Sequence, residues 1–222
     1  MRKRLYTALS SKDAHYCADN DDSDHPIPVI HNIVSTAQIE TTSKGPLDLD
    51  LIRQILPGSS YDRAKFAAMT IRLSNPNCTL LLFSSGKLVV TGVRNWYEGV
   101  LSCLYVSRRL QQRLPRLDFR LRHCDIQNIV AHVELPVEDG TLDLDAMYLR
   151  LNLHSTYQSN LFPGLIYRPP LSPIVLLCFR SGKIVITGGK NKCDVFQGWR
   201  RLWPTVRVFM KKKKLDMIHA FL

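Results

Sequence analysis

Apolar and polar residues alternate along several short segments of the chain, which is the pattern of β-strands with one buried face. Two groups of three such segments stand out, at 65–73, 78–83 and 87–91 and again at 161–168, 174–179 and 183–187. Ser-Gly-Lys joins the last two segments of each group and predicts a hairpin turn. A further β-rich segment precedes each group, around Ile33 and around Ile129. The pattern therefore predicts the same order of strands in both halves of the chain.

Helices are predicted at two places in each half. The sequence Leu-Asp-Leu-Asp at 47–50 and at 142–145 suits the start of a short helix. A longer helix closes each half, with apolar residues at helical spacing and arginines mostly off that stripe. The predicted apolar stripes consist of Tyr97, Leu101 and Leu104 in the first helix and of Val195, Trp199, Leu202 and Val206 in the second. Strands and helices together predict an α+β protein, with helices on one side of an antiparallel sheet.

The two halves are copies of one another. The sequence FSSGKLVVTG at 83–92 returns as FRSGKIVITG at 179–188. An offset of 96 residues relates each of five pairs: Asn32 and Asn128, Phe66 and Phe162, Arg72 and Arg168, Phe83 and Phe179, and Thr91 and Thr187. A period this long is too great for a solenoid repeat and fits a duplicated half-domain.

Charge and composition narrow the class of partner. The 222 residues include 30 Lys and Arg against 19 Asp and Glu, a formal net charge of +11. Such an excess attracts polyanions. The hydrophobic share of 45% excludes a wholly disordered chain. No run of about 20 apolar residues is present, so no transmembrane segment or membrane partner is predicted.

Neither a cofactor nor catalysis is predicted. The six cysteines are scattered, without zinc-ligand spacing, and are interpreted as free buried thiols. His123, Cys124 and Asp125 are consecutive, and consecutive residues of a strand alternate between faces, so they do not converge as a nucleophile and base would. Trp96, Trp199 and Trp203 are interpreted as packing anchors.

Both ends of the chain differ from the repeated part. Residues 13–24 hold five acids and few apolar residues, which predicts a disordered acidic leader. Lys211 to Lys214 form a basic run. That run is read either as a solvated tail or as a nuclear-import or nucleic-acid contact. The predicted organisation is a leader at 1–29, repeats at 30–124 and 125–210, and a basic C-terminal tail at 211–222.

Period-two counting groups the side chains that share a face, although it leaves open which face is buried. The first half groups Asn32 with Val34, Phe66 with Ala68, Thr70 and Arg72, Leu81 with Phe83, and Lys87 with Val89 and Thr91. The second half repeats these groups at matching positions. The phenylalanines are either core residues or exposed wedges, and the two asparagines either turn residues or polar contacts inside strands.

These motifs resemble a known family. The sequences QNIV, KFAA, FSSGKLVVTG and LFPGLIYR are similar to the core of the TATA-box-binding protein family, from residue 30 to about 210. The resemblance implies a pseudo-twofold saddle in which two repeats form one curved antiparallel sheet with helices on the convex side. It implies a nuclear, non-enzymatic initiation factor that binds the minor groove of TATA-like promoter DNA, kinks it and nucleates the initiation complex. The alternative is a paralog that acts mainly as a protein-interaction platform with relaxed or altered DNA specificity.

The resemblance also assigns roles to individual residues. It implies wedges at Phe66, Phe83, Phe162 and Phe179, and central polar contacts at Asn32, Thr91, Asn128 and Thr187. It implies an apolar groove lining at Val34, Leu81, Val89, Val130, Leu177 and Val185. It implies phosphate contacts at Lys65, Arg72, Lys87, Arg168 and Lys183.

Partners follow from the same resemblance. They are double-stranded A·T-rich promoter DNA, general transcription factors IIA and IIB, and associated factors or regulators. The basic helix face with Arg108, Arg109 and Arg113 is consistent with the factor IIA surface. Gln158, Ser159 and Asn160 stand where the family typically carries glutamates that contact factor IIB, so that contact loses its charge.

Overall fold

The computed structural model describes residues 25–42, 45–135 and 141–210. The predicted leader therefore lies outside the described residues as far as residue 24, and the predicted tail at 211–222 lies outside them entirely. The chain divides into two compact units. Unit 1 comprises residues 30–129, and unit 2 comprises, among the described residues, 25–29 and 130–210. The predicted boundary between repeats at 124/125 stays a prediction, because the units divide inside one strand.

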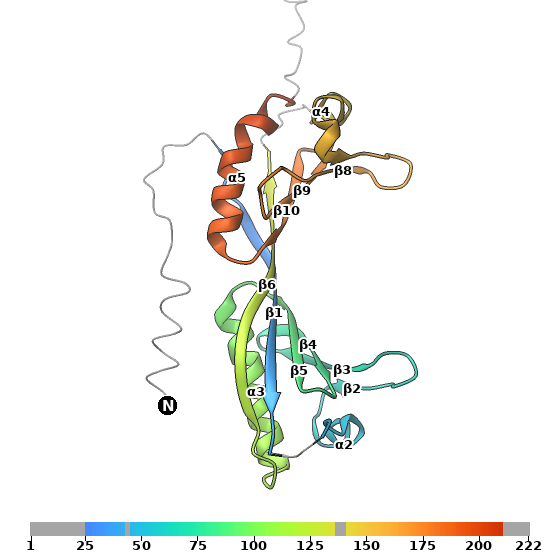
Figure 1. The fold of residues 1–222 in the computed structure, drawn as a ribbon, viewed down its shortest axis with the longest axis vertical. Helices are drawn as coiled ribbons and strands as arrows, with labels where there is room; N and C mark the ends of the chain where they lie inside the picture. Colours follow the sequence, from blue (N-terminus) through green and yellow to red (C-terminus); the bar gives the residue numbers. More distant parts are fainter. Residues whose placement is uncertain (1–24, 43–44, 136–140, 211–222) are drawn as a thin grey trace, which may run out of the picture. The chain divides into compact units, whose positions relative to one another are not determined.

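Each unit repeats one order of elements (Figure 1). Unit 1 contains β1 (Val29–Glu40), α2 (Leu49–Ile55), β2 (Ser59–Ser60), β3 (Ala68–Ser74), β4 (Asn77–Phe83), β5 (Lys87–Val93) and α3 (Trp96–Arg113). The strand β6 (Arg120–Glu134) then leads into unit 2. Unit 2 continues with α4 (Leu144–Leu151), the 3₁₀ turn η1 (Asn152–His154), β7 (Ser155–Thr156), β8 (Gly164–Tyr167), β9 (Val175–Phe179), β10 (Lys183–Gly189) and α5 (Lys192–Arg207).

The strands form a ten-stranded sheet in which hydrogen-bonded neighbours follow the order β2-β3-β4-β5-β1-β6-β10-β9-β8-β7. The pairs β1–β5, β3–β4, β4–β5, β8–β9 and β9–β10 are antiparallel. Both predicted Ser-Gly-Lys hairpins are confirmed, between β4 and β5 and between β9 and β10. The predicted antiparallel α+β fold is confirmed.

The helices begin where polar residues cap them. In α2 the Asp48 side chain accepts the N–H of Leu51 at 3.0 Å, and in α4 the Asp143 side chain accepts the N–H of Ala146 at 3.1 Å. Such caps satisfy donors that have no partner in the first turn. The long helices α3 and α5 are capped in the same way, by Asn95 and Asn191. The repeat therefore extends to the caps.

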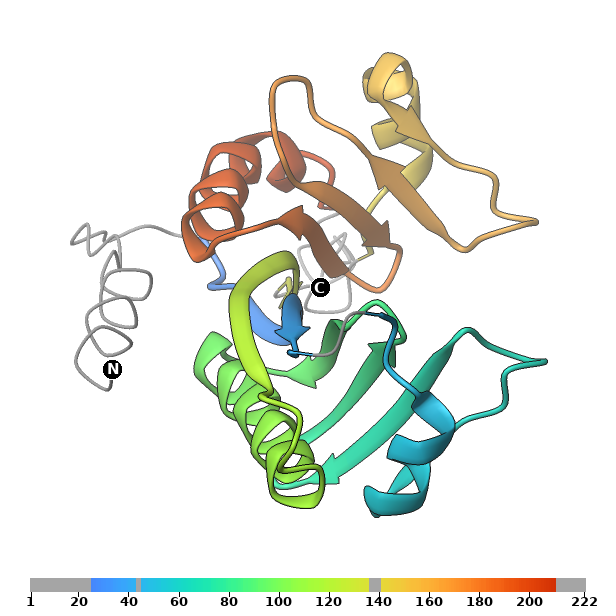
Figure 2. The same ribbon diagram turned by 60° about the horizontal axis from the view of Figure 1, so that its bottom comes forward.

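One face of the sheet in each unit packs against a long helix (Figure 2). In β1 the alternate residues Ile33, Ala37 and Ile39 are at most 5% exposed. The predicted stripe of α5 is confirmed at Val195, Trp199 and Val206, which are fully buried. The indole N–H of Trp199 also donates to the carbonyl oxygen of Pro26 at 2.8 Å, which holds residues 25–29 in unit 2.

The predicted stripe of α3 is wrong. Tyr97 is 51% exposed and Leu101 is 41% exposed, whereas the adjacent residues Trp96, Val100 and Cys103 are buried. Two apolar stripes lie side by side on this helix, and helical spacing by itself does not say which one the sheet covers. The indole N–H of Trp96 donates to the carbonyl oxygen of Cys124 at 3.0 Å, so the anchoring role predicted for this residue is confirmed.

None of the helices in the described part of the chain is long and apolar enough to cross a lipid bilayer.

Candidate nucleic-acid interface

The face of the sheet in unit 1 that α3 does not cover is called here the open face of unit 1. Alternation along β1 places Asn32 and Val34 on this face, since their neighbours Ile33 and Ser35 are buried. Alternation along β4 and β5 adds further partly exposed side chains: Thr79, Leu81, Phe83, Val89 and Thr91. The open face thus collects aliphatic and hydroxyl side chains from every long strand of the unit.

Strand pairing aligns the open face of unit 1 into a row. Thr36 lies opposite Val89, Val89 opposite Leu81, and Leu81 opposite Thr70. Side chains directly opposite each other on antiparallel strands have their Cβ atoms about 4.5–5.5 Å apart. The two aliphatic residues are therefore flanked by a threonine on each side.

Asn32 and Thr91 form a polar pair on this open face. The backbone N–H of Gly92 donates to Asn32 Oδ1 at 2.7 Å, and Asn32 Nδ2 lies 3.3 Å from Thr91 Oγ1. Because a backbone N–H requires an acceptor, this bond fixes which end of the amide is oxygen. The amide nitrogen of Asn32 therefore donates to the Thr91 hydroxyl, and the Asn32 side chain stays partly exposed.

Unit 2 has an equivalent open face, on the side of its sheet that α5 does not cover. Val185 lies opposite Leu177, and Leu177 lies opposite Ile166. Thr187 is partly exposed, as its counterpart Thr91 is in unit 1. Asn128 is partly exposed as well, but it belongs to unit 1. Val130 alternates with the fully buried Ile129 and Ala131, and so belongs to the open face of unit 2 as well.

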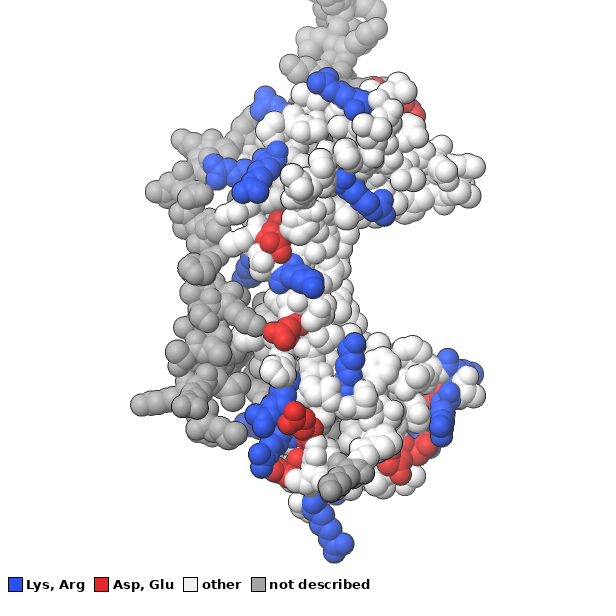
Figure 3. Space-filling view, in the orientation of Figure 1, with Lys and Arg blue, Asp and Glu red and all other residues white. Residues whose placement is uncertain are grey.

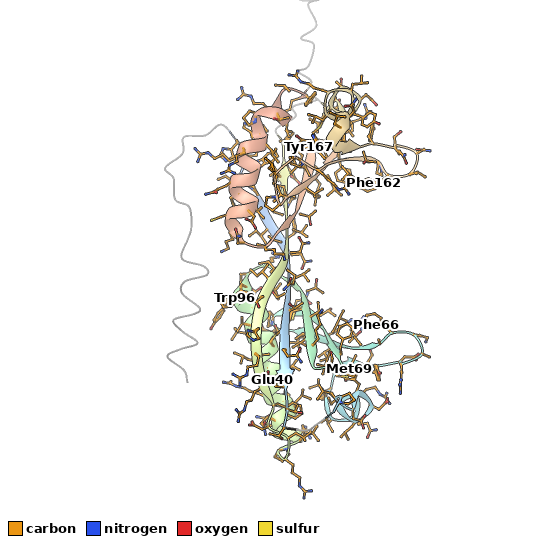
Figure 4. All side chains as sticks on the ribbon, in the orientation of Figure 1. Glu40, Phe66, Met69, Trp96, Phe162 and Tyr167 are labelled. Carbon is orange, nitrogen blue, oxygen red and sulfur yellow. The ribbon has the colours of Figure 1, made fainter. Side chains whose placement is uncertain are left out.

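A pair of phenylalanines lies at one end of each open face. The rings of Phe66 and Phe83 pack edge to face with their centroids 6.4 Å apart. The rings of Phe162 and Phe179 do the same at 5.7 Å. Phe66 is 49% exposed and Phe162 is 36% exposed, which is unusual for a large apolar side chain. Figure 4 shows both residues beside the loops that precede β3 and β8.

Gly164 provides the space for the second pair of rings. A Cβ on this residue would lie 2.7 Å from Phe162 Cε1 and 3.0 Å from Phe179 Cε1. Unit 1 has Ala68 at the equivalent position, and its rings lie farther apart. The glycine therefore lets the two rings of unit 2 pack directly over the strand.

The basic residues predicted to contact phosphate are all exposed. Arg72 lies inside β3, two residues before its end, and Arg168 directly follows β8, whereas Lys87 and Lys183 begin β5 and β10. Lys65 differs, because its Nζ lies 3.1 Å from a carboxylate oxygen of Asp62. Its charge is already paired within the protein, which the sequence did not predict.

The hairpin that carries Lys87 is fixed against the end of β1. Gly86 has φ +82°, and a Cβ on it would lie 2.2 Å from the carbonyl oxygen of Ile39. Gln38 Nε2 also donates to the carbonyl oxygen of Ser85 at 2.8 Å. Only glycine tolerates both the positive φ and this close approach. The position of Lys87 is thereby held by backbone geometry.

The loops that carry the exposed phenylalanines differ in charge. In unit 1 the loop before β3 contains Asp62, Arg63 and Lys65, whereas residues 157–163 of unit 2 contain no charged side chain. The space-filling view shows both signs of charge at the first loop and neither at the second (Figure 3). At the repeat offset of 96 residues, Gln158, Ser159 and Leu161 stand where unit 1 has Asp62, Arg63 and Lys65.

All nineteen residues predicted to bind DNA belong to the described part of the chain. Eighteen lie in the unit expected from the repeat, and Asn128 lies in unit 1, because the units divide after Ile129. Sequence reasoning omitted several partly exposed residues of the open faces, among them Thr36, Thr70, Thr79, His132 and Ile166. Period-two counting already placed Thr70 and Ile166 with the phenylalanines that precede them. The same counting back from Leu81 would have added Thr79, and counting from Asn32 and Asn128 would have added Thr36 and His132.

The buried thiols are poor nucleophiles. Burial raises the pKa of Cys178 to about 12 and raises the pKa of Cys78. The pKa of Cys103 is raised by a hydrogen bond with Cys124 and by burial. A thiol with a raised pKa stays protonated near neutral pH and does not supply the reactive thiolate. Among the described residues no three His, Cys, Asp or Glu side chains gather as a metal site would require.

Comparison with protein families gives a match over both repeats. A family model described as "Transcription factor TFIID (or TATA-binding protein, TBP)" matches residues 27–112 and 123–209.

Similar proteins occur in several eukaryotes. TATA box-binding protein-like 2 of Takifugu rubripes is 36% identical over 190 residues, which cover 84% of this chain and 55% of the relative. TATA-box-binding protein 2 of Arabidopsis thaliana is 36% identical over 194 residues, covering 84% of this chain and 90% of the relative. This chain thus spans from about half to nine-tenths of these two curated relatives.

A solved structure is also similar. The TBP of Methanococcus jannaschii superposes with a TM-score of 0.70 at 31% sequence identity, covering 82% of this chain and 99% of the other.

Proposed function

The chain belongs to the TATA-binding protein family of transcription factors, and from that premise we propose that it binds the minor groove of TATA-like promoter DNA through the open faces of its two units. The observation that carries this proposal is the repetition of one surface in both units. Each open face combines an aliphatic row, a partly exposed Thr and a pair of phenylalanines. Members of this family are transcription factors rather than enzymes.

The chemistry of the open face fits A·T base pairs. In the minor groove these pairs present only acceptors, adenine N3 and thymine O2, whereas G·C pairs add the guanine amino group. Val89 and Leu81 form an apolar surface against which the guanine amino group would clash. The Asn32 amide supplies a donor toward the acceptors of the A·T pairs. The aliphatic rows are expected to discriminate against G·C mainly by shape and desolvation.

The phenylalanine pairs fit the role of wedges. Apolar side chains that enter between base steps cost a few kcal/mol of unstacking, which contacts to the bent duplex offset. Kinking of this kind is characteristic of the TATA-binding protein, and membership of that family extends the expectation to this chain. The exposure of Phe66 and Phe162, together with the space above Gly164, supports this role. Flexible TA steps lower the cost of the bend and favour TATA-like sequences.

The basic residues at the margins of the open faces supply attraction and register. Lys65, Arg72, Lys87, Arg168 and Lys183 are exposed cations at strand ends and turns. Contacts of this kind go to phosphates and carry no sequence information directly. Specificity is assigned to the uncharged residues of the open faces.

Protein partners are part of the same proposal. We assign the nucleus as the location, and general transcription factors IIA and IIB with associated factors as partners. The exposed arginines of α3 support an acidic partner on that helix, where the Arg109 guanidinium lies 5.3 Å from the centroid of the Tyr105 ring. The uncharged residues Gln158, Ser159 and Asn160 imply that a factor IIB contact, if retained, does not rely on acidic side chains.

That uncharged loop also supports a second candidate function. A paralog whose contacts with the initiation machinery have changed would serve as an interaction platform with relaxed or altered DNA specificity. The two functions differ in DNA selectivity and in bending, and both properties are measurable.

The test uses two duplexes of equal length at one salt concentration, one with a TATA element and one with G·C pairs in its place. A donor and an acceptor dye at the duplex ends report bending. We expect tighter binding to the TATA duplex and a shorter end-to-end distance in the complex. Equal affinities with straight DNA would reject minor-groove recognition, and tight binding without sequence preference would favour the platform.

A further inference from the structure

A patch of exposed apolar side chains lies on α4 and η1 of unit 2. It consists of Tyr148, Leu149 and Leu153, which are 38%, 76% and 88% exposed. Leu149 and Leu153 are four residues apart and therefore lie on the same side of the helical segment. These three residues are called the α4 patch.

The equivalent helix of unit 1 carries no such patch. Counted from the caps Asp48 and Asp143, the positions of Tyr148 and Leu149 are filled in α2 by Arg53 and Gln54. The same short helix therefore folds with polar residues at these positions. The apolar side chains of α4 are not required by the fold, which points to a contact specific to unit 2.

The described chain ends beside this helix. Leu142 and Met210 form an antiparallel β-bridge, and the N–H of Asp143 donates to the carbonyl oxygen of Phe209 at 2.9 Å. Asp143 is the N-cap of α4, so the described chain ends at Met210 next to the first turn of that helix. Figure 1 shows the end of α5 beside α4.

The sequence that follows has the length and pattern to reach the α4 patch. Four lysines, Lys211 to Lys214, span about 13 Å when extended at about 3.3 Å per residue. The eight residues of α4 span about 12 Å at 1.5 Å per residue. The next eight residues read LDMIHAFL, in which Leu215, Ile218 and Leu222 recur at helical spacing.

We propose that residues 215–222 dock on the α4 patch within the same chain, with the four lysines as a spacer along α4. The first turn of that helix contains Asp145, whose side chain is 67% exposed and pairs with Arg180. The spacer passes this acidic turn and places Leu215 near Leu149 and Leu153. Docking buries apolar surface of both segments, and the ordering cost is limited because one end of the segment is already held beside the helix. A partner protein that binds α4 must displace the segment first.

Amide hydrogen exchange of the full chain tests this docking independently of DNA binding. In the wild type we expect the amides of residues 215–222 to exchange at least about tenfold more slowly than the same sequence in an unstructured peptide, because exchange requires undocking. The double variant L149Q/L153Q changes only exposed side chains and should restore the unprotected rates. The reciprocal variant I218S/L222S should speed exchange in the last turn of α4.

Leu171→Gln provides the matched control, because Leu171 is a fully exposed leucine in another loop of unit 2. It should leave the exchange of residues 215–222 unchanged. The proposal is overturned if these residues exchange at unprotected rates in the wild type, or if their protection survives both L149Q/L153Q and I218S/L222S. Protection that grows with protein concentration would instead identify a second copy as the occupant and would also overturn intramolecular docking.

Discussion

Asn32 and Thr91 lie on the neighbouring strands β1 and β5, and the amide nitrogen of Asn32 is 3.3 Å from the Thr91 hydroxyl oxygen. The amide oxygen is occupied by the N–H of Gly92 at 2.7 Å. The backbone therefore orients the partly exposed amide on the open face, with its nitrogen toward Thr91, before any ligand arrives. Such preorganisation reduces the ordering cost of binding.

The variant Asn32→Asp tests the proposed hydrogen bond from the Asn32 amide to a base acceptor. The carboxylate retains an acceptor for the Gly92 N–H, so we expect little change in thermal stability, but it places acceptors and a negative charge against the base edges. Because a good base-edge hydrogen-bond pair is worth about 1–3 kcal/mol, the affinity for a TATA duplex should fall by about tenfold or more. Asn77→Asp adds the same charge to an exposed turn of unit 1 and is the control. Equal losses in both variants would attribute the effect to charge alone.

The double variant F162A/F179A tests the wedges. It should abolish bending, measured as the end-to-end distance of a dye-labelled TATA duplex, while salt-dependent binding to a G·C duplex persists. Phe162 is 36% exposed, so we expect only a modest loss of unfolding free energy. Phe119→Ala is the contrasting control, since Phe119 is 7% exposed and a large-to-small change in a core costs about 3–5 kcal/mol. An unfolded double variant would mean that these rings are core residues.

The variant Asp62→Asn tests whether the ion pair between Asp62 and Lys65 competes with a contact between Lys65 and a phosphate. Removing the carboxylate that lies 3.1 Å from Lys65 Nζ frees one cation for a phosphate. Affinity for DNA should rise, and the slope of log affinity against log salt should steepen by up to about 1. Asp118→Asn makes the same change of charge where the carboxylate pairs with Arg120 instead. If both variants gain affinity equally with no difference in slope, Lys65 does not contact phosphate.

Cys178 makes stability depend on pH in the alkaline range. Burial raises its pKa from 9.0 to about 12, so the folded state holds the thiol proton more tightly than the unfolded state does. This contribution is complete below pH 9 and is lost as the pH rises from 9 toward 12, at up to about 1.4 kcal/mol per pH unit. Denaturant titrations of Cys178→Ala should show a shallower decline of unfolding free energy between pH 9 and 10.5. An unchanged slope would exclude Cys178 as the group responsible.

Much of the fold was predictable because the duplication supplies an internal check. Repetition of Ser-Gly-Lys and of the Asp caps predicted both hairpins and both short helices, and the structure confirms them. A local signal that recurs at one offset is hard to attribute to chance. The residues of the open faces were grouped correctly because side chains alternate along a strand with a period of exactly two.

The stripe of α3 was not predictable for the opposite reason. Helical spacing identifies apolar stripes, and α3 has two adjacent apolar stripes. Which stripe is buried depends on how the helix sits on β4 and β5, a choice made by contacts far apart in the sequence. Trp96 belongs to the buried stripe, where its indole N–H donates to the carbonyl oxygen of Cys124.

The sequence by itself determined the repeat, the strands and their turns, and the side chains that share each face, since these depend on the period of the backbone and on local turn chemistry. Only the tertiary structure decided which face α3 and α5 cover, that Lys65 is paired with Asp62, and that Gly92 orients the amide of Asn32. Those outcomes depend on distances between particular atoms once strands and loops are packed, and no periodicity in the chain encodes them.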